Sequence, residues 1–424
     1  MTETLQKYWS EVGQQARAAS RSLLKASTAE KNQALQLIHD EILKNVDEII
    51  SENQKDCDVA RGNSLTEAFI DRLLLDKGRI ETMAQGVVDM IALPDPVGEI
   101  TDIKPRPSGI QVGKMRVPLG VIGIIYEARP NVTIDAAALC IKSGNAAILR
   151  GGSDAFHTNQ CLAKILQNAL FQTNLSEHSV QIVATQDRAV VDLMVTAKNY
   201  IDVIIPRGGK SLVERINANA TVPVIKHLDG VCHTFVDEFA DLELAVKVVD
   251  NAKTQRYAPC NTMETLLVHE NIAKEFLPKI AEIFVVKTVE MRVCEQTQII
   301  LNEHEISTLM ATDADWHEEY LGPIIAIKIV KDLDAAIAHI NHYGSHHTDV
   351  IISEHYSNTT TFLRMVDSAC VMVNASSRFC DGFEFGLGAE IGISTDKIHA
   401  RGPVGLEGLT SQKYIVLGHG EIRT

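Results

Sequence analysis

Apolar residues recur three or four positions apart through residues 1–92, with polar residues between them. The segment 34–43 shows this spacing clearly, and it predicts an amphipathic helix. Two helix starts are indicated by capping boxes at 27–30 and 64–67, where a Ser hydroxyl and a Glu side chain can satisfy opposite backbone N–H groups. We therefore expect a layer of helices over the N-terminal part of the chain.

The pattern changes at residues 93–119, where prolines punctuate short alternating runs. Alternation over 110–117 predicts a strand, and the turn residues 107–109 join it to a preceding strand. Such a hairpin has free edges that need covering, so we expect a partner subunit there. The apolar run 414–417 predicts a last strand that pairs with this hairpin.

From residue 120 onward, apolar runs alternate with helical segments, which predicts parallel strands joined by crossover helices. The expected strands of the first such region are 121–125, 146–149, 180–183, 203–205 and 223–225. The expected elements of the second are a helix over 272–283, strands at 299–301, 324–329, 350–352 and 370–373, and helices over 335–342 and 356–366. A glycine-rich, loop-like segment, 374–408, follows them.

Two loops of the first region, 150–153 and 206–211, combine basic residues with glycines. Ligands bind at the carboxyl ends of parallel strands, where glycines let backbone N–H groups approach a phosphate. Each loop alone fits an ordinary glycine turn equally well. Together they favour a nucleotide, although the chain has neither GxGxxG after the first strand nor GxxxxGK[ST].

Cys260 is the thiol with the most informative surroundings. Pro259 disfavours helix in the residue before it, so Cys260 is expected on a turn entering a strand, where a nucleophile is held without being buried. The ordinary alternative is a half-buried structural thiol. By contrast, Cys57 lies between Asp56 and Asp58, whose charges disfavour a thiolate. Three further cysteines lie in core-like patterns, and three are undecided: Cys140, Cys161 and Cys370, then Cys232, Cys294 and Cys380.

Composition limits the class of protein. A chain of 424 residues predicts two or three domains, and a net charge of −15 argues against nucleic-acid binding. Eight cysteines without a CxxC pair indicate a reducing compartment. The chain has no signal-peptide pattern and no run of roughly 20 apolar residues, so we expect a cytoplasmic protein. The histidines, including His346 and His347, lack ligand spacing; we expect them on the solvated surface and predict no metal site.

Several motifs occur in the order and spacing of the aldehyde dehydrogenase superfamily: 118–125, Asn131, 144–150, Cys260 and 318–323. Three further segments, 126–132, 257–261 and 385–395, are similar to its γ-glutamyl phosphate reductase (glutamate-5-semialdehyde dehydrogenase) branch. The resemblance covers nearly the whole chain.

This resemblance implies an α/β, aldehyde dehydrogenase-like fold in three parts. They are a Rossmann-like cofactor-binding domain at 1–98 and 118–231, an α/β catalytic domain at 232–404, and a β-hairpin oligomerisation arm at 99–117 and 405–424. It also implies a homo-oligomer, a dimer or a tetramer, and a glutamate 5-kinase as a partner that supplies the labile acyl phosphate.

The implied activity is NADPH-dependent reduction of γ-glutamyl 5-phosphate to glutamate 5-semialdehyde and phosphate through a cysteine thioester, in proline biosynthesis. Cys260 matches the family nucleophile, and Asn131 matches the amide that stabilises the oxyanion. Arg150 falls where the superfamily usually has a Lys beside the adenosine ribose, and Glu319 matches the carboxylate that holds the nicotinamide ribose. The full set expected to bind NADPH or NADP is Arg150, Gly151, Arg207, Gly208, Gly209 and Glu319.

One motif departs from the oxidising members of the superfamily. Where these have a Glu that activates water against the thioester, this chain has His227. Loss of a general base commonly slows hydrolysis by about 10² to 10⁴. His227 could replace that base, but a structural role or one beside the substrate is favoured.

Arg129 and Arg378 are candidates for binding the anionic groups of the substrate, because a guanidinium pairs bidentately with carboxylate and phosphate. Surface or interdomain salt bridges explain both arginines equally well.

Two other functions compete with this interpretation. An NAD-dependent aldehyde oxidiser would not need inorganic phosphate. A non-catalytic binding module would not need to retain Cys260, Asn131 and Glu319 together.

Overall fold

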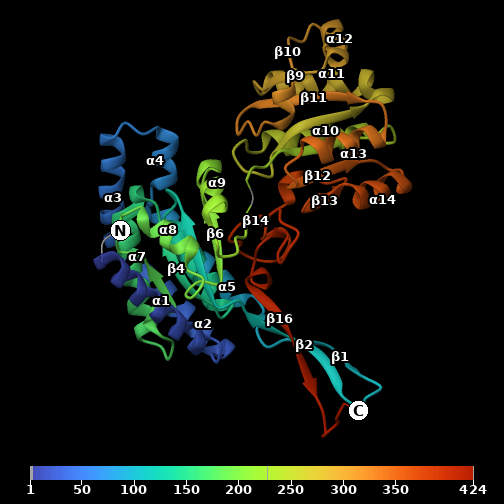
Figure 1. Cartoon of the computed structure of the whole chain (residues 1–424). Helices are drawn as coiled ribbons and strands as arrows, with labels where there is room; N and C mark the ends of the chain where they lie inside the picture. The colour runs from blue at the N-terminus through green and yellow to red at the C-terminus, as the bar shows by residue number, and fades with distance from the viewer. Residues whose placement is uncertain (1–2, 227, 424) are drawn as a thin grey trace. The chain divides into compact units, whose positions relative to one another are not determined.

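Five helices occupy the N-terminal part of the chain, as the apolar spacing predicted (Figure 1). The computed structural model describes residues 3–226 and 228–423. The helices are α1 (Glu3–Leu23), α2 (Thr28–Lys44), α3 (Val46–Gly62), α4 (Glu67–Leu73) and α5 (Lys77–Ala92). Among the described residues, no helix combines the length and the apolar character needed to cross a lipid bilayer.

The two predicted helix starts have different outcomes. The first is confirmed: Ser27 Oγ accepts from the Glu30 N–H, and the Glu30 carboxylate accepts from the Ser27 N–H at 2.8 Å. The second is wrong in detail. Helix α4 is capped by Thr66, whose hydroxyl accepts from the Phe69 N–H, whereas Ser64 has a left-handed φ of 56° and lies outside the cap.

A four-stranded parallel sheet follows, in the order β5-β4-β3-β6. Its strands are β3 (Val121–Tyr126), β4 (Ala146–Arg150), β5 (Val180–Ile182) and β6 (Val203–Arg207), and the connecting helices are α6 (Asn131–Lys142), α7 (Phe156–Phe171) and α8 (Ala189–Thr196), with α9 (Lys210–Asn219) after β6. The predicted strand at 223–225 is wrong: Val224 forms only an isolated bridge with Ile204. Pro223 has no N–H with which to extend a ladder.

The predicted hairpin and its C-terminal partner strand are confirmed. β1 (Ile100–Pro105) and β2 (Gln111–Pro118) are antiparallel, and β16 (Thr410–Leu417) pairs with β2 along its whole length. The three strands form a separate sheet in the order β1-β2-β16.

The second α/β region is a seven-stranded parallel sheet, β10-β9-β11-β8-β7-β12-β13. Its strands are β7 (Cys232–Val236), β8 (Met263–His269), β9 (Glu290–Val293), β10 (Leu309–Met310), β11 (Ile324–Val330), β12 (Thr348–Ile352) and β13 (Cys370–Val373), and its helices are α10 (Leu242–Thr254), α11 (Glu270–Val286), α12 (Glu295–Glu303), α13 (Leu333–Tyr343) and α14 (Tyr356–Met365). Successive strand residues face opposite sides. Leu266 therefore belongs to a core cluster with residues of α10, α11 and α12, and Leu267 belongs to another with residues of α13 and α14.

Two expectations for this region are wrong. Residues 299–301, predicted as a strand, lie in α12, because a short apolar run does not by itself distinguish a strand from a buried helical turn. His347, expected on the surface, is fully buried, and its Nδ1 lies 2.8 Å from Thr348 Oγ1. The segment 374–408 carries only short elements: η4 (Ser377–Phe379), β14 (Ile393–Ser394), β15 (Gly402–Pro403) and η5 (Glu407–Leu409).

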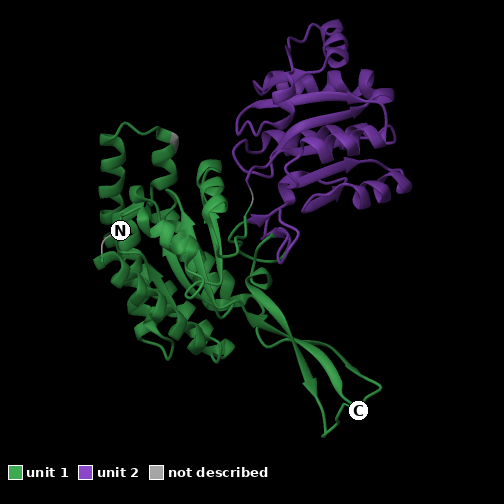
Figure 2. Ribbon diagram, viewed as in Figure 1, with its two compact units in different colours: residues 1–226, 386–392, 403–424 green, residues 227–385, 393–402 purple. Residues whose placement is uncertain are grey.

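The chain divides into two compact units (Figure 2). Unit 1 comprises Met1–Lys226, Gly386–Gly392 and Pro403–Thr424, and unit 2 comprises His227–Phe385 and Ile393–Gly402. The four-stranded sheet and the hairpin sheet belong to unit 1, and the seven-stranded sheet belongs to unit 2. This is the mixed α/β architecture that the resemblance implied.

Candidate active site

Cys260 lies on a turn between α10 and β8 in unit 2, as the sequence predicted, and its side chain is half-buried. The turn is closed by two bonds: the Thr262 N–H donates to the Pro259 carbonyl at 3.0 Å, and Thr262 Oγ1 donates to the Arg256 carbonyl at 2.8 Å. These bonds fix the backbone on both sides of the sulfur while leaving the side chain partly accessible.

Two residues before or at the start of β7 support the carbonyl of Cys260. A Cβ built on Gly230 would lie 2.0 Å from this oxygen, so only glycine fits there without a shift. Cys232 Sγ donates to the same oxygen at 3.1 Å. Burial raises the pKa of the Cys232 thiol well above its usual value, which keeps it in the protonated, donating form.

Asn261 connects this turn to the segment that carries Arg378. Its Nδ2 donates to the Cys380 carbonyl at 2.9 Å, and its carbonyl accepts from Ser377 Oγ at 2.6 Å. Because Arg378 belongs to that segment, Cys260 and Arg378 are held in one hydrogen-bonded frame.

Arg378 has the features of an anion-binding residue. Its Nε donates to Gln255 Oε1 at 3.0 Å, while its buried Nη1 has no partner among the described residues. Burial, followed by the charge of Arg256, lowers the pKa of the guanidinium, and the Cys260 thiol acts in the opposite direction. Two guanidinium groups that disfavour each other's charge are stabilised by a bound anion. Arg256 is a candidate that the sequence interpretation missed.

Glu319 lies on the loop after η3 (Asp313–His317). Its Oε1 accepts from the Gly230 N–H at 2.9 Å. Since Gly230 packs against the Cys260 carbonyl, the carboxylate expected at the nicotinamide ribose is linked through one residue to the turn of Cys260.

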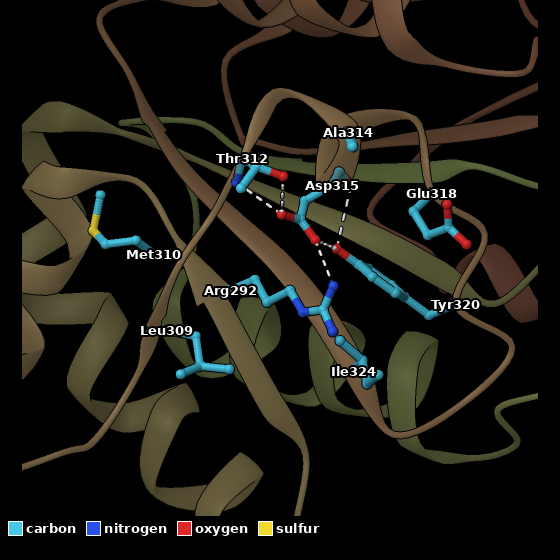
Figure 3. Close-up of a pocket in the computed structure, with 9 residues that line it drawn as sticks. All are labelled: Arg292, Leu309, Met310, Thr312, Ala314, Asp315, Glu318, Tyr320 and Ile324. Carbon is cyan, nitrogen blue, oxygen red and sulfur yellow. Dashed lines mark hydrogen bonds and ion pairs between the residues drawn. The ribbon is translucent and has the colours of Figure 1, made fainter.

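A pocket of about 650 Å³ lies beside this loop. Figure 3 shows Arg292, Asp315 and Tyr320 converging within it: Arg292 Nη1 donates to Asp315 Oδ1 at 2.7 Å and the Tyr320 hydroxyl donates to the same oxygen at 3.0 Å. Burial alone would raise the pKa of Asp315, but the bonds from Arg292, Thr312 and Tyr320 together lower it to about 2. These polar groups satisfy one another, so the cluster shapes the loop that leads to Glu319 and does not offer a reactive group.

Asn131, the predicted oxyanion amide, is the first residue of α6 in unit 1. Its Nδ2 donates to Asp135 Oδ2 at 3.0 Å, which orients the amide and leaves its second N–H available. Burial raises the pKa of Asp135 to about 6, with Asn131 and Arg207 opposing the shift. Asp135 was missed from the sequence, although its position four residues after Asn131 on a helix was a usable signal.

Arg150 ends β4, and its surroundings fit an anionic ligand. Nη1 donates to the Gly151 carbonyl at 2.8 Å and Nη2 to the Gln186 carbonyl at 3.3 Å, but the buried Nε has no partner among the described residues. Burial, followed by the charge of Arg188, lowers the pKa of Arg150. A buried cation near a second cation fits the phosphate of an adenosine nucleotide. The sequence interpretation did not identify Arg188 as a candidate.

The second glycine loop is already occupied by a carboxylate. The Gly209 N–H donates to Glu127 Oε2 at 2.8 Å, and a Cβ on Gly208 would lie 2.7 Å from that carboxyl group. The anion that faces the start of α9 in this structure is therefore Glu127. Arg207, which ends β6, instead lies beside Gly392, where a Cβ would be 3.2 Å from its Nη1.

The structure gives little or no contact information for the two remaining candidates. Arg129 is exposed in the turn between β3 and α6, and its N–H donates to the Glu127 carbonyl at 2.6 Å. His227 lies outside the described residues. Within unit 2 the structure thus brings Cys260, Arg378 and Glu319 into one frame, and within unit 1 it groups Asn131 with Arg207 around Asp135.

Comparison with known proteins places the chain in a family. The sequence profile of the aldehyde dehydrogenase family matches residues 6–312. The chain is 59% identical over 430 residues to a γ-glutamyl phosphate reductase of Psychrobacter arcticus, covering 100% of this chain and 99% of that protein.

Two solved structures extend the comparison. A γ-glutamyl phosphate reductase of Thermotoga maritima is similar with a TM-score of 0.95 and 46% identity, covering 98% of this chain and 100% of the other. An engineered glycolyl-CoA reductase solved with bound NADP⁺ is similar with a TM-score of 0.66 and 15% identity, covering 96% of each chain. The second likeness concerns the fold alone.

Proposed function

Because the chain belongs to the γ-glutamyl phosphate reductases of the aldehyde dehydrogenase family, we propose that it reduces γ-glutamyl 5-phosphate to glutamate 5-semialdehyde and phosphate with NADPH, through a thioester on Cys260. This is the reductive step of proline biosynthesis from glutamate. The observation that carries the proposal is the Cys260 turn. There a half-buried thiol shares a hydrogen-bonded frame with Arg378, whose Nη1 has no partner in the described part of the chain.

The first step forms a covalent acyl-enzyme. The Cys260 thiolate attacks the acyl carbon, a C–S bond forms, and the C–O bond to the phosphate breaks with its electron pair leaving on phosphate. Arg378 favours this step in two ways, because a nearby guanidinium stabilises a thiolate and pairs with the departing phosphate. Covalent capture holds a labile acyl group in place for reduction.

We assign the stabilisation of the tetrahedral oxyanion to the side-chain amide of Asn131 and a backbone N–H near Cys260. The bond from Asn131 Nδ2 to Asp135 supports the assignment, because it restricts the rotation of the amide before substrate binds. Removal of one such donor commonly costs about 10² to 10³ in kcat.

A nicotinamide cofactor is implied by the family, and the residues present fit it. Bound NADPH supplies the hydride that reduces the thioester carbonyl. Arg150, whose Nε has no partner within residues 3–226 and 228–423 and which has Arg188 nearby, would hold an anionic group of the adenosine half. Glu319 would hold the nicotinamide ribose. After reduction, cleavage of the C–S bond returns the electron pair to the sulfur of Cys260 and releases the aldehyde.

The sequence around Gly230 favours phosphate over water as the acyl acceptor in the reverse direction. The Glu that activates water in oxidising members is replaced by His227 in this chain. Without that carboxylate the thioester is protected from hydrolysis, so it survives until phosphate attacks it.

The deciding experiment measures NADPH formation from glutamate 5-semialdehyde and NADP⁺, with and without inorganic phosphate. We expect a strict phosphate requirement in the wild type and only background activity in Cys260→Ser. Cys294→Ser is the matched control, because Cys294 is also half-buried but lies at the start of α12. Phosphate-independent NADPH formation would favour the aldehyde oxidiser, and normal activity in Cys260→Ser would refute the thioester.

We also propose that the sheet β1-β2-β16 joins subunits. It exposes apolar side chains that a monomer would leave in water, among them Ile100, Tyr414 and Val416, which are 46%, 73% and 58% exposed. Sedimentation analysis of Val416→Lys tests this: we expect smaller species than in the wild type, and an unchanged mass would contradict the assignment.

A further inference from the structure

We infer that Glu264, paired with Lys253, is a positioning residue that holds the loop of Glu319 in place for cofactor binding. This inference rests on the proposed function, because it concerns the residue assigned to the nicotinamide ribose. It adds a pair of buried residues to which neither the motif resemblance nor the comparisons assign a role.

The pair lies on the two elements that flank the nucleophile. Lys253 is near the end of α10 and Glu264 is the second residue of β8, so Cys260 lies between them in the chain. The side chains form an ion pair and are only 0% and 1% exposed. A buried ion pair is weak evidence for stabilisation, since apolar residues of similar volume often serve equally well. The contacts that this pair makes with a neighbouring loop indicate a further role.

The second oxygen of Glu264 makes one of these contacts. Glu264 Oε1 accepts from the Leu321 N–H at 3.2 Å. This hydrogen bond joins β8 to the loop that carries Glu319. Leu321 has a left-handed φ of 53°, which costs free energy for a residue with a Cβ. The hydrogen bond therefore holds this loop in a conformation that its sequence does not favour.

Lys253, the other member of the pair, contacts the same loop. Its Nζ lies 5.9 Å from the centre of the Tyr320 ring. Residues 320 and 321 are thus both in contact with the buried pair, and Glu319 directly precedes them. Glu319 in turn accepts from the Gly230 N–H, and Gly230 packs against the Cys260 carbonyl. The pair, the loop, the ribose carboxylate and the nucleophile turn form one continuous set of contacts.

The alternative is that the pair only stabilises the fold, and two double variants separate these roles. The amide variant is Lys253→Met/Glu264→Gln and the thioether variant is Lys253→Met/Glu264→Met; both abolish the ion pair and have nearly the same shape. Only the amide variant keeps a side-chain oxygen for the Leu321 N–H. Any difference between the two therefore reports on that hydrogen bond.

The primary readout is the Kd for NADPH, measured by fluorescence titration without turnover, together with Tm and the KM for phosphate. We expect the thioether variant to bind NADPH about tenfold more weakly than the amide variant, the size expected for one lost hydrogen bond. The KM for phosphate should differ by less than about twofold between them, because the contacts of Arg378 are untouched. Equal NADPH affinity in the two variants overturns the inference.

The wild-type protein separates this inference from the function on which it rests. Wild-type protein that binds NADPH and requires phosphate, with both variants equally affected, refutes only the positioning role. Wild-type protein that binds no NADPH refutes the proposed function and the inference with it. If the thioether variant does not fold, Lys253→Met/Glu264→Leu replaces it, since leucine also has no oxygen for the Leu321 N–H and leaves the contacts of Tyr320 with Asp315 intact. The same selective rise in Kd is then expected, and an unchanged Kd overturns the inference.

Discussion

Gly230 and Cys260 are in direct backbone contact: a Cβ on Gly230 would lie 2.0 Å from the Cys260 carbonyl oxygen. The Gly230 N–H also donates to Glu319, so one residue contacts both the turn of Cys260 and the carboxylate that we propose for cofactor binding. The position of the sulfur is therefore coupled to a residue 30 positions earlier in the chain.

Gly230→Ala should displace the Cys260 turn, because the methyl group meets backbone that has no freedom to rotate away. We expect kcat/KM to fall by about 10², the cost of moving a reacting group by roughly 1 Å, and the free energy of unfolding to fall by about 1–3 kcal/mol. Gly62→Ala is the control, since a Cβ there has no neighbouring side chain or distant backbone within 4 Å among the residues that the structure describes. Similar kinetics in the two variants would contradict the contact.

Arg378→Gln should weaken binding of the anionic part of the substrate, because it removes the guanidinium whose Nη1 is buried without a partner among the described residues. In the direction of semialdehyde oxidation, we expect the KM for phosphate to rise about tenfold while the KM for NADP⁺ changes by less than about twofold. Arg364→Gln, an exposed position on α14, is the matched control. Equal increases in both KM values would remove Arg378 from the substrate site.

Arg150→Lys should reduce the preference for NADPH over NADH. Lysine keeps the charge but loses the fork that contacts two carbonyls and would pair with a phosphate. We expect kcat/KM for NADPH to fall about tenfold with little change for NADH, checked by a parallel titration of NADPH Kd. Arg215→Lys on α9 controls for surface effects, and an equal loss with both cofactors would show that Arg150 contacts only the shared ribose.

Asp315→Asn should destabilise the protein at neutral pH and not at acid pH. The pKa of Asp315 is lowered from 3.8 to about 2, since its hydrogen bonds outweigh the opposing effect of burial. A lowered pKa contributes stability that is present above pH 3.8 and is lost as the pH falls toward 2. We expect the free energy of unfolding of the variant to be about 2 kcal/mol lower than that of the wild type at pH 7. In urea unfolding, this difference between variant and wild type should shrink below about pH 4. Asp334→Asn at an exposed position serves as control, and a loss independent of pH would contradict the assignment.

The sequence determined the local elements, including the turn that carries Cys260. The N-terminal helices, the hairpin with its C-terminal partner strand and the turn of Cys260 were all predicted, because apolar spacing, prolines and turn residues act within a few residues of one another. The secondary-structure predictions at 64–67, 223–225 and 299–301 were wrong for the same reason. A short local pattern is compatible with two conformations, and the packing of neighbouring elements determines which one forms.

Only the tertiary structure decided which side chains meet. The contact of Gly230 with Cys260, the occupation of the Gly209 loop by Glu127, and the bond from Glu264 to Leu321 each join residues separated by 30 or more positions. Periodicity tells which face of an element is buried, but not which distant element covers it. The partners follow from strand order and register, and these are set by the packing of the whole sheet.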